Sequence, residues 1–132
     1  MARGFDSHQE RLQALSLLGK DLARRAKSKC EICQASGVPL RIHEVAPAPR
    51  EPDFAHVILV CAGCDAALLD PSAPLDAKRW RVLTETLWNE APAVRVGVVR
   101  LLQRLAREAD WARETLEEAY LEEEILEWAA KA

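Results

Sequence analysis

The chain has 132 residues, a length that suits one domain with a substantial core. Hydrophobic residues make up 49% and charged residues 30%, which excludes an intrinsically disordered chain. No apolar run is long enough to span a membrane, and the amino terminus lacks the apolar segment of a signal peptide. We therefore expect a cytoplasmic protein with no membrane partner.

The net charge of −3 is unevenly distributed. Residues 1–50 carry nine Lys/Arg and five Asp/Glu, a net charge of +4, whereas residues 51–132 carry nine and sixteen, a net charge of −7. A chain with this acidic balance is not expected to bind nucleic acid through overall charge. Any contact with nucleic acid would have to use the basic amino-terminal half.

The first predicted element is a helix over residues 7–27. Ser7 and Glu10 have the spacing of a capping box, and leucines recur behind them at helical intervals. Basic residues gather at the end of this helix and just beyond it, and they have two interpretations. They are either a solvated helix end that complements the helix dipole or a patch that binds phosphates. These residues are Lys20, Arg24, Arg25, Lys27 and Lys29.

All four cysteines of the chain lie in two Cys-x-x-Cys pairs, Cys30/Cys33 and Cys61/Cys64. One such pair places two sulfur atoms on a tight turn, and two pairs complete a tetrahedron of thiolates. Zinc prefers this closed arrangement when its role is structural. In a cytoplasmic protein, cysteines are more often metal ligands than disulfides. We therefore predict that these four residues bind one Zn²⁺ within a zinc-binding module over residues 28–70.

The residues between the two pairs predict a β-hairpin. Residues 40–45 partly alternate apolar and polar side chains, and residues 57–60 form a β-branched run that leads into the second pair. Three prolines in residues 46–52 exclude helix or central strand there and predict an extended loop. Antiparallel pairing of the two strands would bring the cysteine pairs together, as in a treble clef or a zinc ribbon. A short helix is predicted over residues 65–69.

Other uses of the four cysteines are less consistent with the residues around them. Iron sites of the rubredoxin kind usually have glycine after each pair, but Gln34 and Asp65 stand at these positions. The pairs do not lie in the βαβ pattern of thioredoxin-like redox proteins. Removal of the metal is expected to unfold residues 28–70 and to leave much of the helical signal of residues 76–131.

The order of cysteine pair, strand and cysteine pair also resembles the treble-clef scaffold of HNH nucleases. Those enzymes place a general-base histidine in the strand and usually a metal-binding histidine directly after the second pair. Here Glu44 stands at the base position with His43 beside it, and Asp65 stands at the ligand position. Because the histidine base is displaced, nuclease or other metal-dependent hydrolase activity is a minor alternative. His43 and His56 are interpreted as ordinary residues at strand edges.

The rest of the chain, residues 75–131, is predicted to be helical. Asp76 is expected to cap the start of a helix, and Leu75 and Trp80 have the spacing of a hydrophobic staple across that start. Pro92 is expected in the first turn of the next helix. The arginines on this second helix are interpreted as solvated or paired with carboxylates. They are Arg100, Arg104 and Arg107. The last segment is rich in glutamate, and a break near residues 119–121 predicts a pair of helices.

The four tryptophans all lie in this second half and are expected to fill its core. The alternative is that one or more of them form a recognition surface. The four are Trp80, Trp88, Trp111 and Trp128. Together these elements predict one mainly α-helical domain over residues 1–132, with a small β zinc module packed against five to six helices. The Trp-rich helices and the Glu-rich end are also a candidate face for a homodimer.

Several sequence blocks carry a combined signature, and they are residues 29–33, 44–45, 59–64, 80–83, 88–94, 120–124 and 126–129. Their tryptophan and Pro-Ala-Val motifs are more specific than the cysteines. Together these blocks resemble the bacterial PhnA-type zinc-ribbon family, and the similarity covers nearly the whole chain. The family takes its name from an operon for alkylphosphonate use, which describes gene neighbourhood and not chemistry. Its members typically continue into a small β-barrel-like domain, which this chain is expected to lack.

The resemblance implies a zinc-binding, bacterial, cytosolic protein. We therefore expect a non-catalytic binding or adaptor module whose partner is a protein. A nucleic-acid-associated, degenerate HNH-like protein that uses Arg41 and the basic helix end is the alternative. Salt-dependent binding to DNA and RNA would distinguish these two hypotheses.

Overall fold

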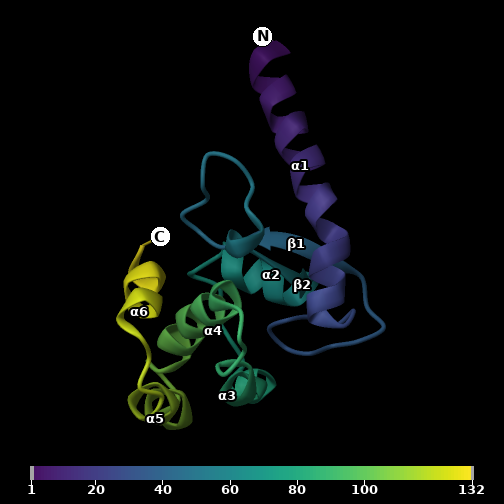
Figure 1. The fold of residues 1–132 in the computed structure, drawn as a ribbon. Coiled ribbons are helices and arrows are strands. Elements are labelled where there is room, and N and C mark those ends of the chain that lie inside the picture. The colour runs from purple at the N-terminus through teal and green to yellow at the C-terminus, as the bar shows by residue number, and fades with distance from the viewer. Residues whose placement is uncertain (1, 132) are drawn as a thin grey trace.

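The computed structural model describes the backbone of residues 2–131 and the side chains of residues 7–131. These residues form a mainly helical fold with one two-stranded antiparallel sheet, which confirms the predicted fold class (Figure 1). No described helix has the length and apolar character needed to cross a membrane. The elements in chain order are α1 Ala2–Ala26, β1 Leu40–Glu44, β2 Val57–Cys61, α2 Ala62–Leu69, α3 Leu83–Thr86, α4 Pro92–Leu105, α5 Asp110–Glu118 and α6 Glu123–Ala130.

The predicted hairpin is confirmed, with Leu40 opposite Cys61 and Glu44 opposite Val57. Helices cover both of its faces, and Figure 1 shows the strands between α1 and α2. Val57 and Leu59 belong to the apolar cluster formed with α1, whereas Ile58 and Val60 belong to the main core. Every residue of β2 is therefore buried, which explains why its sequence is a continuous apolar run.

Helix α1 begins earlier than predicted, at Ala2 and not at Ser7. Ser7 consequently lies inside the helix, and the predicted capping box is wrong. The amino-terminal turns of α1 extend beyond the rest of the molecule, while Leu22 and its apolar neighbours near the other end pack on the hairpin (Figure 1). Arg11 joins α1 to the proline-rich loop, because its Nε lies 2.9 Å from Glu44 Oε2 and its Nη1 donates to the Arg50 carbonyl.

Helix α4 lies at the centre of the main core, and nine of its fourteen residues are buried. It also packs closely on the cysteine-containing module, because a Cβ placed at Gly97 would lie 3.3 Å from Ile32 and 3.5 Å from Ile58. Three of the four cysteines, Cys30, Cys61 and Cys64, belong to the same buried cluster as α4. The predicted module and the helical part therefore share one core.

Two elements of the carboxyl-terminal half differ from the prediction. The sequence predicts a regular α-helix after Asp76. The structure has instead a 3-10 turn, Arg79–Val82, followed by the single turn of α3. As a result Trp80 is buried but Trp88 is 63% exposed and does not fill the core.

The predicted break near residue 120 is confirmed: it separates α5 from α6, and Tyr120 has a φ of 47°.

The arginines of α4 also differ from the prediction. Arg100 donates to the Trp128 carbonyl at 2.9 Å and to the Ala129 carbonyl at 3.2 Å, at the end of α6. Arg104 donates to the carbonyls of Ala67 and Ala73, near the end of α2. Arg100 therefore donates to carbonyls in the last turn of α6, and Arg104 donates to one carbonyl in the last turn of α2 and to one in the loop that follows. Their carbonyl acceptors come from distant segments, so the local sequence does not reveal them.

We predict that Arg100→Met lowers the free energy of unfolding by about 2 kcal/mol, because the substitution leaves carbonyls at the end of α6 without a charged donor. Urea denaturation of the two proteins measures the difference. Arg107→Met, which removes an exposed arginine just beyond α4, is the matched control and should stay within about 0.5 kcal/mol of the unmodified chain. Equal effects of the two substitutions would show that Arg100 does not anchor α6.

Candidate metal centre

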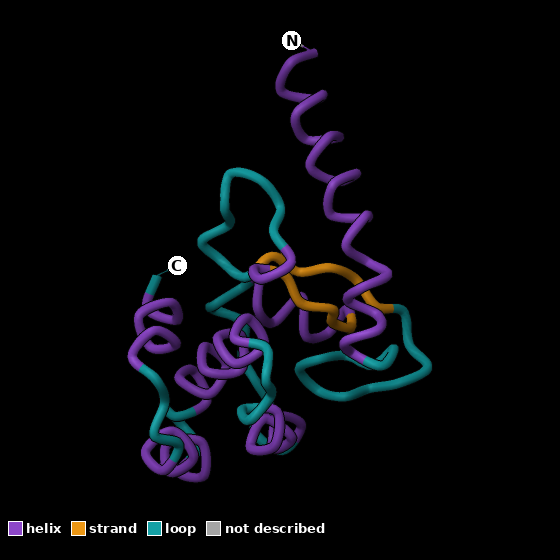
Figure 2. Tube along the Cα trace, viewed as in Figure 1, coloured by secondary structure: helices purple, strands orange, loops and turns teal. Residues whose placement is uncertain are grey.

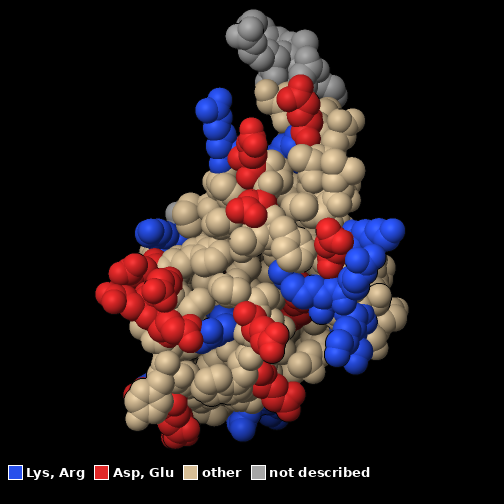
Figure 3. Space-filling view, viewed as in Figure 1, with Lys and Arg blue, Asp and Glu red and all other residues tan. Residues whose placement is uncertain are grey.

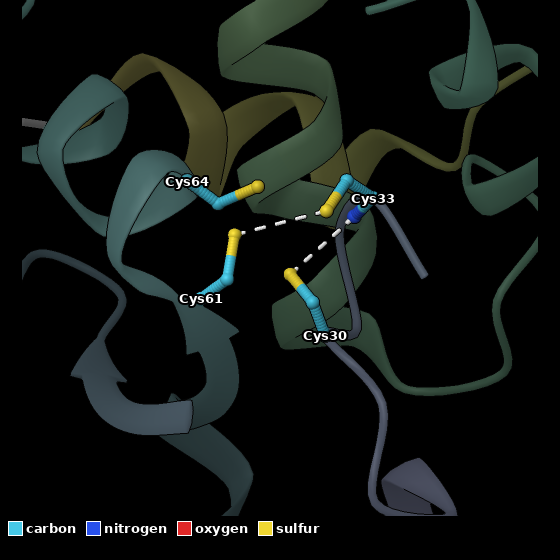
Figure 4. A group of neighbouring side chains, drawn as sticks. All are labelled: Cys30, Cys33, Cys61 and Cys64. Atoms are coloured by element: carbon cyan, nitrogen blue, oxygen red, sulfur yellow. Dashed lines mark hydrogen bonds between the residues drawn. The ribbon is translucent and has the colours of Figure 1, made fainter. Parts of the chain in front are cut away.

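The structure brings the four predicted cysteines together. Their Sγ atoms all lie within 4.8 Å of one another, and they point toward a common centre in Figure 4. The Sγ atoms of Cys33 and Cys61 are 3.7 Å apart. A tetrahedral ion with metal–sulfur bonds of about 2.3 Å places its ligands about 3.8 Å apart. The cluster therefore has the size and the donor atoms to hold one metal ion.

The first cysteine pair is formed by a tight turn directly after α1. The Gln34 amide donates to the Cys30 carbonyl at 2.8 Å, and the Cys30 amide donates to the Ala35 carbonyl at 2.9 Å. Gln34 takes a left-handed conformation, with a φ of 66°. The Cys33 amide points at Cys30 Sγ, 3.5 Å away, and an amide so placed stabilises a thiolate (Figure 4).

The second pair spans the junction of β2 and α2. Cys61 is the last residue of the strand and Cys64 lies in the first turn of the helix, which begins at Ala62 and not at Asp65 as predicted. The sequence does not reveal this earlier start, because Cys61 occupies the N-cap position without a side-chain hydrogen bond and the usual polar cap residue is missing. The sequence predicts either a treble clef or a zinc ribbon. A second cysteine pair at the amino terminus of a helix is the arrangement of a treble clef.

The proximity of the sulfur atoms changes their acidity. A hydrogen bond from Cys64 lowers the pKa of Cys30 to about 4. The same hydrogen bond, together with burial and the charge of the other cysteines, raises the pKa of Cys64, and burial raises the pKa of Cys33. Cys33 and Cys64 therefore become thiolates beside Cys30 only when a cation balances the charge.

Glu31, between the first two cysteines, fixes this pair to the sheet and was not singled out from the sequence. It is only 5% exposed. Its amide donates to the Leu59 carbonyl at 2.8 Å and its carboxylate accepts from the Leu59 amide at 2.9 Å. Arg25 of α1 binds both carboxylate oxygens at 2.8 Å and also donates to the Val57 carbonyl. The sequence contains one signal for this role: Glu31 is the single charged residue between the two cysteines of the first pair.

The residues at the HNH positions already have partners of their own. Glu44 is paired with Arg11, and His43 Nδ1 lies 2.9 Å from Asp65 Oδ1. His43 is also buried beside α2 and is not an edge residue as interpreted from the sequence. His56 lies at the edge, where it contacts Asp53 and the ring of Trp128. These pairings engage both carboxylates at the HNH positions.

Comparisons with protein-family models, with curated proteins and with solved structures gave no match. Function must therefore be inferred from the cysteine cluster and from the surface around it.

We predict that Arg25→Met lowers the free energy of unfolding by about 3 kcal/mol, because it leaves the Glu31 carboxylate buried without its cation. Urea denaturation of the metal-loaded chain gives the value. The control is Arg24→Met, whose ion pair with Asp21 is exposed and should contribute less than about 1 kcal/mol.

A double variant separates the ion pair from general packing. When Glu31→Gln is added to Arg25→Met, the unpaired charge disappears, so the double variant should be more stable than the sum of the two single effects predicts. Simple additivity of the two substitutions would contradict the proposed coupling of α1 to the cysteine turn.

Proposed function

We propose that the chain is a structural-zinc protein of the PhnA-like type that acts as a non-catalytic binding or adaptor module. Four cysteine sulfurs within 4.8 Å of one another support zinc, because a complete set of thiolates fits its preferred tetrahedron. Four protein ligands leave no position for water or substrate, which favours a structural role. A bacterial origin and a cytoplasmic location belong to the same proposal, on the basis of the family resemblance.

The observation that carries the binding role is the exposure of Trp88 in a large groove. The groove has a volume of about 900 Å³ and lies between the end of α1 and the residues around the start of α4. We call it the Trp88 groove. Its charged lining consists of three cations and three carboxylates, which are Arg25, Lys27, Lys29, Glu31, Glu85 and Glu90. Tryptophan is over-represented among the residues that dominate binding energy at protein interfaces. A large aromatic ring between opposite charges suits a protein segment with an apolar anchor.

Charge on the visible surface supports the same partner. Figure 3 shows basic side chains gathered over the carboxyl-terminal end of α1 and acidic side chains gathered over α6. The Trp88 groove adjoins the basic region, so an acidic residue beside the apolar anchor would meet Lys27 and Lys29. We therefore propose a protein partner, with a homodimer as one form that such a partner can take.

One observation favours nucleic acid as a second candidate. Trp88 offers a face for base stacking, and two lysines in the same groove are placed to meet phosphates. The carboxylates of Glu85 and Glu90 in the lining oppose this use, because they repel a phosphate backbone. Binding to single-stranded DNA or RNA that weakens steeply with salt would support the second candidate and exclude the first.

The metal proposal predicts one zinc ion per chain, measured by mass spectrometry of the native protein. Removal of zinc with a chelator should abolish hydrogen-exchange protection in residues 28–70, because structural zinc contributes about 10 kcal/mol or more to folding. Since α4 packs on Ile32 and Ile58, we expect α4 to lose protection as well. Unchanged exchange in residues 28–70 after metal removal would contradict a structural role.

The binding proposal predicts that Trp88→Ala reduces capture of the partner by at least about tenfold, because truncation removes the apolar anchor. Quantitative mass spectrometry of proteins captured by the tagged chain gives the ratio. The matched control is Tyr120→Ala, which removes an aromatic side chain that is 94% exposed and lies outside the groove. Capture of the same proteins at equal levels by both variants would refute the Trp88 groove as the binding site.

A further inference from the structure

A second hollow, with a volume of about 580 Å³, opens beside the second cysteine pair. Apolar side chains of Val38, Pro39 and Val82 form part of its lining, together with the exposed guanidinium groups of Arg41 and Arg79. We call it the arginine hollow. Its lining shares no residue with the Trp88 groove, so the two are separate surfaces.

Arg79 is held in place without using its hydrogen-bond donors. Its Cζ lies 4.3 Å from the ring centre of Trp80, and Trp80 is itself buried and therefore a fixed platform. Within residues 7–131, the Arg79 guanidinium has no carboxylate partner and makes no hydrogen bond to the protein. A guanidinium carries five N–H donors in a planar fork, so this one is oriented and available to a ligand.

Gly63 allows Arg79 to approach the cysteine pair. A Cβ at this position would lie 2.6 Å from Arg79 Nη2, a distance that real Cβ atoms do not reach. The glycine is not needed for its backbone conformation, because it lies in the first turn of α2 with ordinary helical geometry. Because Gly63 has no side chain, the Arg79 guanidinium can lie against the cysteine-containing turn, at the wall of the hollow.

Arg41 supplies a second, largely available cation. Its side chain is 55% exposed, and its one carboxylate contact in residues 7–131 is with Asp65 at 3.9 Å, outside hydrogen-bond distance. The other oxygen of Asp65 is bound by His43. Four thiolates and one divalent ion carry a net charge of −2, which the two arginines offset. An anion that enters the hollow therefore meets two guanidinium groups that offset the charge of the metal centre, with the Asp65 carboxylate already engaged by His43.

We propose that the arginine hollow binds a small oxyanion, a phosphate or a carboxylate group, that is attached to an apolar body. Arginine forks bind both groups through paired hydrogen bonds, and the apolar lining contacts the attached body. This site is additional to the proposed binding of a protein segment in the Trp88 groove and does not depend on it.

The proposal is tested by amide NMR titration of the full-length, metal-loaded chain with phenyl phosphate, benzoate and inorganic phosphate. We expect saturable shifts at Gly63 and Arg41, with tighter binding of the two aromatic anions than of inorganic phosphate. The ratio between phenyl phosphate and benzoate identifies the preferred anionic group. The absence of saturable shifts with all three probes would overturn the proposal.

Three variants locate the site. Arg79→Ala should weaken phenyl phosphate binding about tenfold, the effect of one lost charge-assisted contact, whereas Arg24→Ala removes the same charge on α1 and should leave binding unchanged. Gly63→Ala keeps every charge but displaces the Arg79 guanidinium, and it should weaken binding severalfold. Alanine is the better helix former, so this variant is expected to fold and to retain its metal.

A purely structural role for Arg79 gives a different result. Arg79→Ala would then lose its metal to a chelator more readily, while Gly63→Ala would bind phenyl phosphate as the unmodified chain does. That combination, or equal affinities of Arg79→Ala and Arg24→Ala, would overturn the proposal.

Discussion

Four sulfur atoms lie within 4.8 Å of one another in this protein, and at this spacing four thiolates can coexist only around a cation, which the cluster has the size to hold. The antiparallel register of the hairpin makes this proximity possible, because it fixes Cys61 at the end of β2 directly before α2. The cation and the sheet therefore depend on each other. Without an ion Cys33 and Cys64 stay protonated and cannot act as thiolate ligands, and without the register the second pair does not face the first.

The surrounding packing extends this dependence to the whole chain. Glu31 binds the edge of β2 and accepts from Arg25, so α1, the first cysteine pair and the sheet are joined by one buried carboxylate. On the other face, Gly97 lets α4 approach Ile32 and Ile58. Figure 2 shows a long loop on each side of β1. Side-chain contacts from α1 and α4, and not a larger sheet, therefore hold the cysteine cluster in place.

The sequence was most informative where chemistry is local. Cysteine spacing, β-branched runs and prolines correctly predicted the clustering of the four cysteines, the hairpin and the start of α4. Prediction failed where long-range contacts decide the structure: Arg100 and Arg104 bind carbonyls about 30 residues away or more, by residue number. Glu31 was missed for the same reason. Trp88 was misplaced because a 3-10 turn interrupts the helical periodicity on which the prediction relied.

Arg11 and Arg25, both on α1, hold opposite ends of the cysteine-containing module, since Arg11 binds Glu44 and Arg25 binds Glu31. They are separated by about 21 Å along the helix axis at 1.5 Å per residue. Insertion of one residue between them would rotate one arginine by about 100° relative to the other. The length of α1 between these two arginines is therefore fixed, because an insertion of whole helical turns would restore the rotation but would still move one arginine along the axis, away from its carboxylate.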